Sequence, residues 1–134
     1  MAQLIQVLDS WPLLAYFEKQ AAAPQAIEIL EQAAREEKKL LISAVNWGEI
    51  LYITEQRYGP MKRDQIEDIM GQMPLHVYSA DVGLAREAAR FKTQYKLGYA
   101  DCFAAALAFL KDAQLVTGDR DFRPLKDKIR ILWL

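Results

Sequence analysis

Short apolar runs alternate with longer segments of helical periodicity along this chain. Five runs predict buried β-strands, at 4–8, 40–42, 75–78, 115–117 and 129–134. Apolar residues recur at helical spacing between these runs, which predicts helices over about 10–17, 24–39, 43–58, 63–73, 79–95 and 99–111. Strands that alternate with helices indicate an α/β layer fold around a parallel sheet, and short apolar strands fit a sheet covered on both faces.

Proline, glycine and serine mark where several of these elements begin and end. Pro12 is tolerated in the first turn of a helix, so the first helix begins close to residue 10. Ser43 is a suitable N-cap for the third helix, and Gly59–Pro60 ends it. Residues 118–121 read as a turn that contains glycine and aspartate.

Four carboxylates lie in apolar surroundings. Asp9 closes the first apolar run, and Asp119 follows the run 115–117. Glu49 and Asp101 lie inside largely apolar helical segments. Acidic side chains are seldom buried without a partner, and sites in open parallel sheets lie beyond the carboxyl ends of the strands. We therefore expect the four side chains to converge on one edge of the sheet.

Each acid also has a local explanation when it is taken alone. Asp9 is suited to capping the helix that follows it, and Glu49 can extend from a helix face into solvent. Asp119 and Asp121 lie in a glycine-containing turn, where aspartate is common. Asp101, near the start of an apolar helix, is the hardest of these acids to explain by local structure.

A divalent cation accounts for the acids together. Clustered carboxylates repel one another, and without a counter-charge at least one takes up a proton. Mg²⁺ or Mn²⁺ binds carboxylate oxygens, retains waters, and activates a water for attack on a phosphodiester. Ser10, Asn46 and Thr117 lie beside the acids in the sequence. Each of them either orients water and the metal shell or forms a local cap or turn bond.

Length and composition favour a single domain over residues 1–134. The chain is 52% hydrophobic, which allows a sizeable core. Charges interrupt every apolar run, and no basic segment precedes an apolar one at the N-terminus. These features argue against a membrane span or a secretory signal and predict a cytoplasmic protein. Cys102, the only cysteine, forms no intrachain disulfide and fits simple packing.

The charge distribution leaves a nucleic-acid partner open. A net charge of −1 neither supports nor excludes such a partner, although it argues against binding through a large basic surface. Basic residues nevertheless crowd the last part of the chain, beyond Asp119. Arg120, Arg123 and Lys126 are therefore candidates for contact with nucleic-acid phosphates, and a solvated edge is the alternative.

Four segments, spread over essentially the whole chain, form a known pattern when they are taken together: VLDS at 7–10, ISAVNWGE at 42–49, LGYADCFAAA at 97–106 and LVTGDRDF at 115–122. They resemble the PIN domain family, most closely the VapC-type toxins of prokaryotic toxin–antitoxin pairs. The resemblance implies a three-layer α/β fold with a central parallel sheet flanked by helices, and a Mg²⁺- or Mn²⁺-dependent endoribonuclease. It also implies a homodimer inhibited by a VapB-like antitoxin, whose tail occupies a groove near the acids.

The resemblance assigns roles to individual residues. Asp9 and Asp101 correspond to the strongest metal ligands of the family's acidic quartet. Glu49 and Asp119 complete the quartet, directly or through water. Three further residues take supporting positions, two of them as small hydroxyl groups: Ser10, Thr117 and Asp121.

One departure from the family pattern follows Ser10. Family members usually carry small or aliphatic residues there, whereas this chain has Trp11–Pro12. The indole ring either walls the site or forms part of the antitoxin groove. We expect exposed apolar surface near Trp11, Leu14 and Phe17 to bind a partner.

Two other functions are alternatives to the ribonuclease. Gly118–Asp119 is similar to the late acidic motif of haloacid dehalogenase-type phosphatases, but that family needs two acids flanking one residue after the first strand, and position 11 is Trp. The second rival is a catalytically inactive PIN-like domain that binds RNA or protein. The presence of all four acids disfavours it.

Overall fold

Five parallel strands form one sheet in the computed structural model, which describes residues 4–134. The strands are β1 (Gln6–Leu8), β2 (Leu40–Ser43), β3 (Leu75–Tyr78), β4 (Gln114–Thr117) and β5 (Arg130–Trp133). Their order across the sheet is β3-β2-β1-β4-β5. Leu8 at the end of β1 pairs with Ile42 of β2 and Val116 of β4. The predicted parallel α/β sheet is thereby confirmed.

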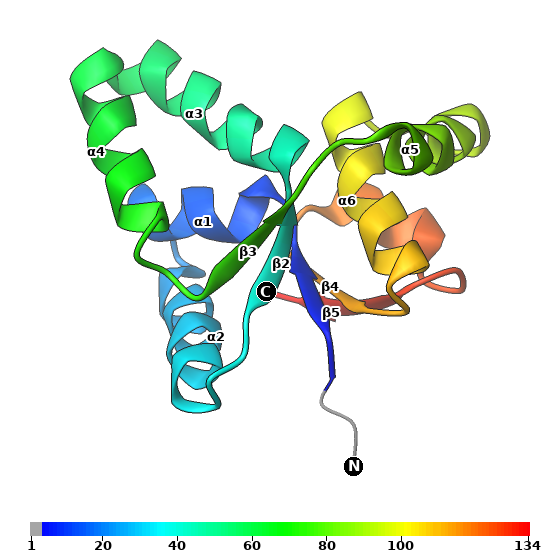
Figure 1. Ribbon diagram of the computed structural model, residues 1–134, viewed down its shortest axis with the longest axis horizontal. Helices are drawn as coiled ribbons and strands as arrows, with labels where there is room; N and C mark the ends of the chain where they lie inside the picture. Colours follow the sequence, from blue (N-terminus) through cyan, green and yellow to red (C-terminus); the bar gives the residue numbers. More distant parts are fainter. Residues whose placement is uncertain (1–3) are drawn as a thin grey trace.

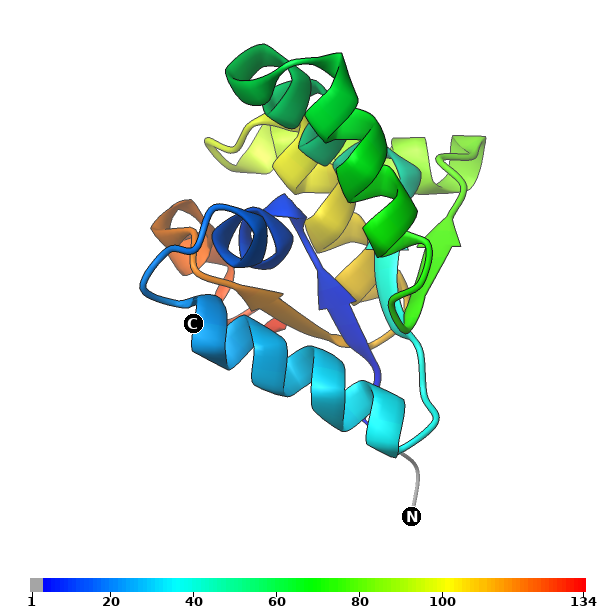
Figure 2. The ribbon, with the colours of Figure 1, turned by 90° about the vertical axis from the view of Figure 1, so that its left-hand side faces the viewer.

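Helices cover both faces of this sheet (Figures 1 and 2). One face carries α1 (Ser10–Phe17), α2 (Ala23–Arg35), α3 (Ala44–Tyr58) and α4 (Pro60–Met70). The other carries α5 (Val82–Gln94), α6 (Tyr99–Leu110) and the 3₁₀ helix η1 (Arg120–Leu125). Helices on both faces of one sheet make the expected three layers.

Alternation along the strands divides the core into two parts. Val7, Leu41 and Leu115 pack among residues of α5, α6 and η1, whereas their strand neighbours Leu8 and Ile42 pack against the other helical layer. Successive side chains of a strand point to opposite faces, so each central strand supplies both cores. The wholly buried β2 confirms a sheet covered on both sides at its centre.

The edge strand β3 departs from that expectation. His76 and Val77 are exposed, and Val77 keeps 40% of its surface accessible. β3 pairs only with β2, so it lies at the edge of the sheet, where the helical layers end. The apolar run at 75–78 therefore predicted the strand β3 correctly but overestimated how deeply it is buried.

Most helix starts follow the local signals. Ser43 accepts a hydrogen bond from the backbone N–H of Asn46 and caps α3, as predicted. Gly59 adopts φ +93°, which separates α3 from α4, and Pro60 opens α4 three residues earlier than its apolar pattern suggested. Asp81 caps α5, so this helix begins after the predicted start at residue 79.

The turn predicted over 118–121 runs into a helix that the sequence pattern did not indicate. Asp119 caps η1 by accepting from the backbone N–H of Asp121, and Pro124 lies inside this short helix. The second helix ends at Arg35, before its predicted end at residue 39. No helix within residues 4–134 has the length and apolar character needed to cross a membrane.

Candidate active site

The four predicted acids meet at the carboxyl edge of the sheet. Asp9 directly follows β1, the central strand, and Asp119 follows the neighbouring β4. Glu49 lies in α3, which begins where β2 ends, and Asp101 lies in the first turn of α6. All four line one pocket with a volume of about 310 Å³. The structure thus brings together residues that are up to 110 positions apart in the chain.

Asp9 is the most deeply buried of these acids, with 1% of its surface exposed. Its Oδ1 accepts a hydrogen bond from the backbone N–H of Trp11 at 3.2 Å, which caps α1. Its Oδ2 accepts from Oγ1 of Thr117 at 2.8 Å. Asp9 therefore caps α1 and also lines the acidic pocket, and each of its oxygens keeps a lone pair for a ligand.

Thr117 connects two of the acids. Its hydroxyl donates to Asp9 and accepts from the backbone N–H of Asp119 at 3.0 Å. Asp119 is half-buried and uses its Oδ1 to accept from the backbone N–H of Asp121 at 2.9 Å. Asp121 itself is exposed. The position of Thr117 at the end of β4 therefore fixes the distance between the first and the last acid of the set.

The acids raise one another's proton affinity. Burial raises the pKa of Asp9 well above its usual value, and the charges of Asp101 and Asp119 add to this. Hydrogen bonds from Thr117 and Trp11 only partly offset these effects. Burial, followed by the charges of Asp119, Glu49 and Asp121, raises the pKa of Asp101 to about 7. Such shifts, from burial first and neighbouring acids second, are typical of functional sites.

Glu49 and Asn46 show how α3 contributes to the site. Ser10 donates from its Oγ to Oε1 of Glu49 at 2.5 Å, which ties the start of α1 to α3. Asn46 is fully buried, accepts from Ser43, and donates from Nδ2 to the carbonyl oxygen of Ala100 at 3.1 Å. Asn46 does not line the pocket and instead joins the start of α3 to the start of α6. It thereby positions Glu49 relative to the first turn of α6.

Trp11 forms a wall of the pocket and packs on Gly118. A Cβ atom added to Gly118 would lie 2.3 Å from Cη2 of Trp11, so no other residue fits at position 118 with the ring in this place. The bulky Trp11, two residues after Asp9, therefore fits in shape against Gly118, the residue before Asp119. Their contact connects the loop after β1 to the loop after β4.

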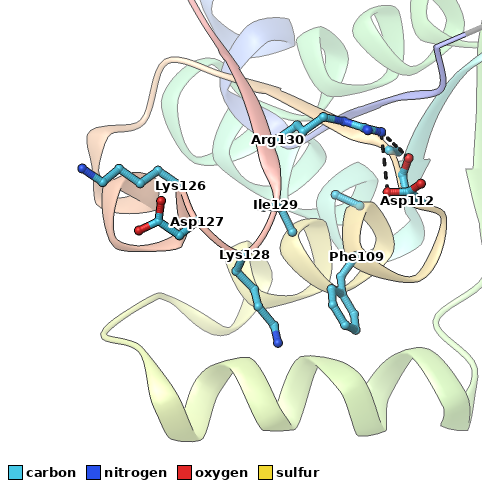
Figure 3. Close-up of a pocket in the computed structure, with 9 residues that line it drawn as sticks. Phe109, Asp112, Lys126, Asp127, Lys128, Ile129 and Arg130 are labelled. Carbon is cyan, nitrogen blue, oxygen red and sulfur yellow. Dashed lines mark hydrogen bonds and ion pairs between the residues drawn. The ribbon is translucent and has the colours of Figure 1, made fainter.

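The predicted phosphate-binding residues do not form one group. The guanidinium of Arg120 lies over the ring of Trp133, 4.8 Å from its centroid, at the carboxyl end of β5. Arg123 donates from Nε to the carbonyl oxygen of Arg120 at 3.1 Å. Lys126 lines a separate cavity with Ile129 and Arg130, at the amino ends of the strands (Figure 3).

Three residues of the pocket lie outside those predicted from the sequence, and two of them, Glu18 and Arg57, are charged. Glu18, at the end of α1, and Arg57, in the last turn of α3, line the same pocket as the acids. Arg57 follows Glu49 by eight residues, a spacing that returns a helical side chain roughly to the same side. This spacing could have identified Arg57 from the sequence, whereas no sequence pattern near Glu18 indicates its position in the pocket.

The residue types at this site fit a divalent cation. Carboxylate oxygens are the ligands that Mg²⁺ and Mn²⁺ prefer, and burial and neighbouring acids raise the pKa of both Asp9 and Asp101. Within residues 4–134, no group of three or more Asp, Glu, His or Cys side chains is already arranged to hold a metal ion. Mg²⁺ is commonly held by one or two carboxylates together with waters, so such a cage is not required.

Solved structures with the same fold include several toxin–antitoxin proteins. VapBC2 from Rickettsia felis, bound to a DNA fragment from its promoter, is 17% identical, with a TM-score of 0.78 over 96% of this chain and 98% of that chain. DNA-bound VapBC from Salmonella typhimurium is 19% identical, with a TM-score of 0.72 over 97% and 98%. VapC20 from Mycobacterium tuberculosis, a sarcin–ricin loop cleaving toxin, is 15% identical, with a TM-score of 0.72 over 89% and 93%.

Sequence comparison gives the family. No curated protein matches the chain. The family model of the PIN domain matches residues 7–128. This match begins just before Asp9 and ends beyond Asp119, so it includes the whole acidic pocket. The chain therefore belongs to the PIN domain family.

Proposed function

We propose that this protein is a Mg²⁺- or Mn²⁺-dependent endoribonuclease, the toxin of a VapBC-type toxin–antitoxin pair. The observation that carries the proposal is the pocket in which Asp9, Glu49, Asp101 and Asp119 converge, with the pKa of Asp101 raised to about 7. A fold shared with VapC20, a sarcin–ricin loop cleaving toxin, supports RNA as the substrate.

Asp9 and Asp101 would hold the cation, with Glu49 and Asp119 completing its surroundings directly or through water. The bound cation supplies the counter-charge for a phosphodiester and lowers the pKa of a water for its attack. Thr117 holds Asp9 in one orientation by its hydrogen bond, and Ser10 does the same for Glu49. Trp11 excludes water from one side of the pocket.

Cation binding is tested without relying on catalysis. Mn²⁺ should raise the thermal midpoint of the wild-type chain, because a ligand that binds only the native state stabilises it. The double variant Asp9→Asn plus Asp101→Asn should lose that increase. An equal Mn²⁺-induced shift in both proteins, or none in the wild type, would sink the metal site.

RNA cleavage is the second part of the test. The wild-type chain with Mn²⁺ should cut single-stranded RNA at internal positions, and chelation by EDTA should stop the reaction. Mn²⁺ binding without any cleavage of RNA would favour the alternative, a PIN-like module that binds RNA or protein without catalysis. Arg120 and Arg123 remain proposed phosphate contacts at the carboxyl edge, and Lys126 is the weakest of the three because it lies at the other edge.

We also propose a VapB-like antitoxin as partner and a homodimer as the assembly. The partner surface predicted at Trp11, Leu14 and Phe17 is partly buried in this chain, and none of the three side chains is fully enclosed. Phe17 lines an apolar groove with Pro24, Ile27 and other residues of α1, α2 and α4. Co-purification with the product of the adjacent gene, followed by measurement of the mass of the complex, tests both proposals.

A further inference from the structure

Among the described residues 4–134, Arg57 is the only basic one that lines the acidic pocket. Five carboxylates line the same pocket, namely Asp9, Glu18, Glu49, Asp101 and Asp119. Arg57 lies eight residues after Glu49 on α3, which corresponds to about 12 Å along the helix axis at 1.5 Å per residue. The pocket therefore has the four predicted acids at one end and the pair of Glu18 and Arg57 at the rim.

Glu18 holds Arg57 in place. Both carboxylate oxygens of Glu18 accept from Nη1 of Arg57 at 2.6 Å, and Oε2 also accepts from the hydroxyl of Tyr58 at 2.8 Å. Burial raises the pKa of Glu18, but the hydrogen bonds from Arg57 and Tyr58 outweigh this and leave its pKa below the usual value. Glu18 is thus an anion with two donors, fixed where α1 meets the end of α3.

The guanidinium of Arg57 keeps donors for a ligand. Its hydrogen bonds to described residues use Nη1 alone, and its side chain is 52% exposed, whereas that of Glu18 is 12% exposed. Nε and Nη2 therefore remain available toward solvent at the rim. A planar guanidinium with two free donors on one side matches two oxygens of a phosphate.

We infer that Arg57 binds a backbone phosphate of the RNA next to the one that is cut, with Glu18 as the residue that positions it. This inference rests on the proposed ribonuclease function. The four acids other than Glu18 repel a polyanion, and a cation held by Asp9 and Asp101 would compensate only for the phosphate at the reaction centre. Arg57 lies two helical turns beyond Glu49, at the exposed end of the same pocket, which places it to contact a second phosphate.

Direct binding separates this role from catalysis. The chain of residues 1–134 carrying Asp101→Asn is titrated against a fluorescein-labelled single-stranded oligoribonucleotide at several salt concentrations. Adding Arg57→Gln should raise the Kd about tenfold, as expected for loss of a hydrogen-bonded charge. The slope of log affinity against log salt should fall by about 0.7, the value for one phosphate contact on a single strand.

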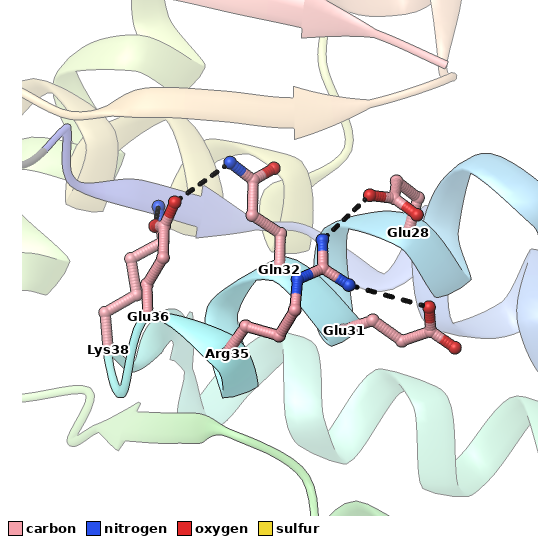
Figure 4. A network of polar contacts seen from close by, with 6 residues as sticks. All are labelled: Glu28, Glu31, Gln32, Arg35, Glu36 and Lys38. Carbon is pink, nitrogen blue, oxygen red and sulfur yellow. Dashed lines mark hydrogen bonds and ion pairs between the residues drawn. The ribbon is translucent and has the colours of Figure 1, made fainter.

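Arg35 offers a matched control. It is an arginine paired with glutamates, Glu28 and Glu31 on α2, and its side chain is 60% exposed (Figure 4). It lines none of the pockets described above. Arg35→Gln removes the same charge and should change the Kd by less than about twofold. Arg57→Lys keeps the charge but lacks the paired donors of the guanidinium. Its salt slope should therefore equal that of the parent chain, while its affinity should lie between those of the parent and Arg57→Gln.

Several results would overturn the role of Arg57. These are equal effects of Arg57→Gln and Arg35→Gln, an unchanged salt slope, or no RNA binding by the parent chain. In the metal-loaded enzyme with Asp101 intact, Arg57→Gln should raise KM and leave kcat within about twofold, and a fall in kcat alone would also contradict it. Absence of cleavage by the wild type would overturn the nuclease proposal. The binding titration would still test whether Arg57 contacts RNA, because it does not depend on cleavage.

Discussion

At the carboxyl edge of the sheet acids face acids, whereas at the amino edge acids face bases. Asp9 and Asp101 share a pocket with three further acids, and burial together with the charge of Asp119 raises the pKa of both. At the amino ends of β4 and β5, Asp112 lies 3.7 Å from Arg130, within a cavity of about 250 Å³ that also contains lysines (Figure 3).

The difference shows which of the two charged cavities has charges of one sign in excess. Exposed pairs of opposite charge neutralise each other in solvent and contribute little to stability. Like charges around a buried carboxylate make the folded protein retain protons, so the charged state is unfavourable until a cation binds. Charge alone does not mark a site. A candidate site is indicated instead by an excess of charges of one sign that lie close to a buried carboxylate.

The largest expected effect is the loss of RNA cleavage when Asp101, at the carboxyl edge, is replaced. Asp101→Asn keeps the shape of the side chain and removes its charge, so RNA cleavage should fall at least about a hundredfold while the fold persists. Asp112→Asn at the amino edge is the matched control and should leave cleavage unchanged. Initial rates at saturating Mn²⁺, with circular dichroism for the fold, decide the outcome. Undiminished cleavage by Asp101→Asn would refute its role.

The second effect concerns the packing that closes the carboxyl edge. Gly118→Ala should destabilise the protein by about 2 kcal/mol, because its Cβ would collide with the ring of Trp11. Gly48→Ala in α3 is the control, since nothing lies within 4 Å of the added Cβ, and alanine in a helix should stabilise by about 0.5–1 kcal/mol.

Urea unfolding of both glycine variants gives these values. The Gly118→Ala loss should shrink when Trp11→Ala is combined with it, because the collision then has no partner. A loss of the same size in the presence and absence of the indole would show that Gly118 is needed for another reason.

A third effect is the pH dependence of the metal-free protein. The folded-state pKa of Asp101 is about 7, above its unfolded value near 4, so the folded state binds more protons between these values. Stability should therefore fall as pH rises from about 4 to about 7. In EDTA, the thermal midpoint should be about 5 °C lower at pH 8 than at pH 5 because of this group, after allowance for its partial exposure.

Asp101→Asn should flatten this decline, and Mn²⁺ at pH 8 should reverse it in the wild type. Asp9 acts in the same direction, since burial raises its pKa. A wild-type midpoint that rises between pH 5 and pH 8 in EDTA would contradict the shifted proton affinity of the acids.

The smallest effect is expected at the amino edge. Arg130→Gln removes the charge that faces Asp112, but both side chains are largely exposed, at 55% and 96%. The thermal midpoint should therefore change by less than about 2 °C, with no dependence on Mn²⁺. A larger change that responds to Mn²⁺ would show that the two edges are coupled and would weaken the contrast between them.

Sequence patterns predicted most helices and strands, because the apolar runs of strands and the helical spacing of apolar residues are both set by nearby residues. The run 40–42 became β2, Ser43 capped α3, and Asp9 and Asp119 followed their strands as expected. The helix η1 escaped prediction, because an aspartate cap and a proline inside a short 3₁₀ segment produce no apolar repeat. The exposure of Val77 escaped as well, since strand order decides which apolar run lies at the edge.

The sequence by itself determined that four acids follow or interrupt apolar segments of a parallel α/β chain, and it identified the family pattern that contains them. Only the tertiary structure decided that Trp11 packs on Gly118, that Asn46 joins α3 to α6, and that Lys126 lies away from the acids. It also paired Glu18 with Arg57, which are 39 residues apart. Periodicity acts between neighbours in the chain, whereas these contacts depend on how α1, α3 and α6 pack around the end of β1.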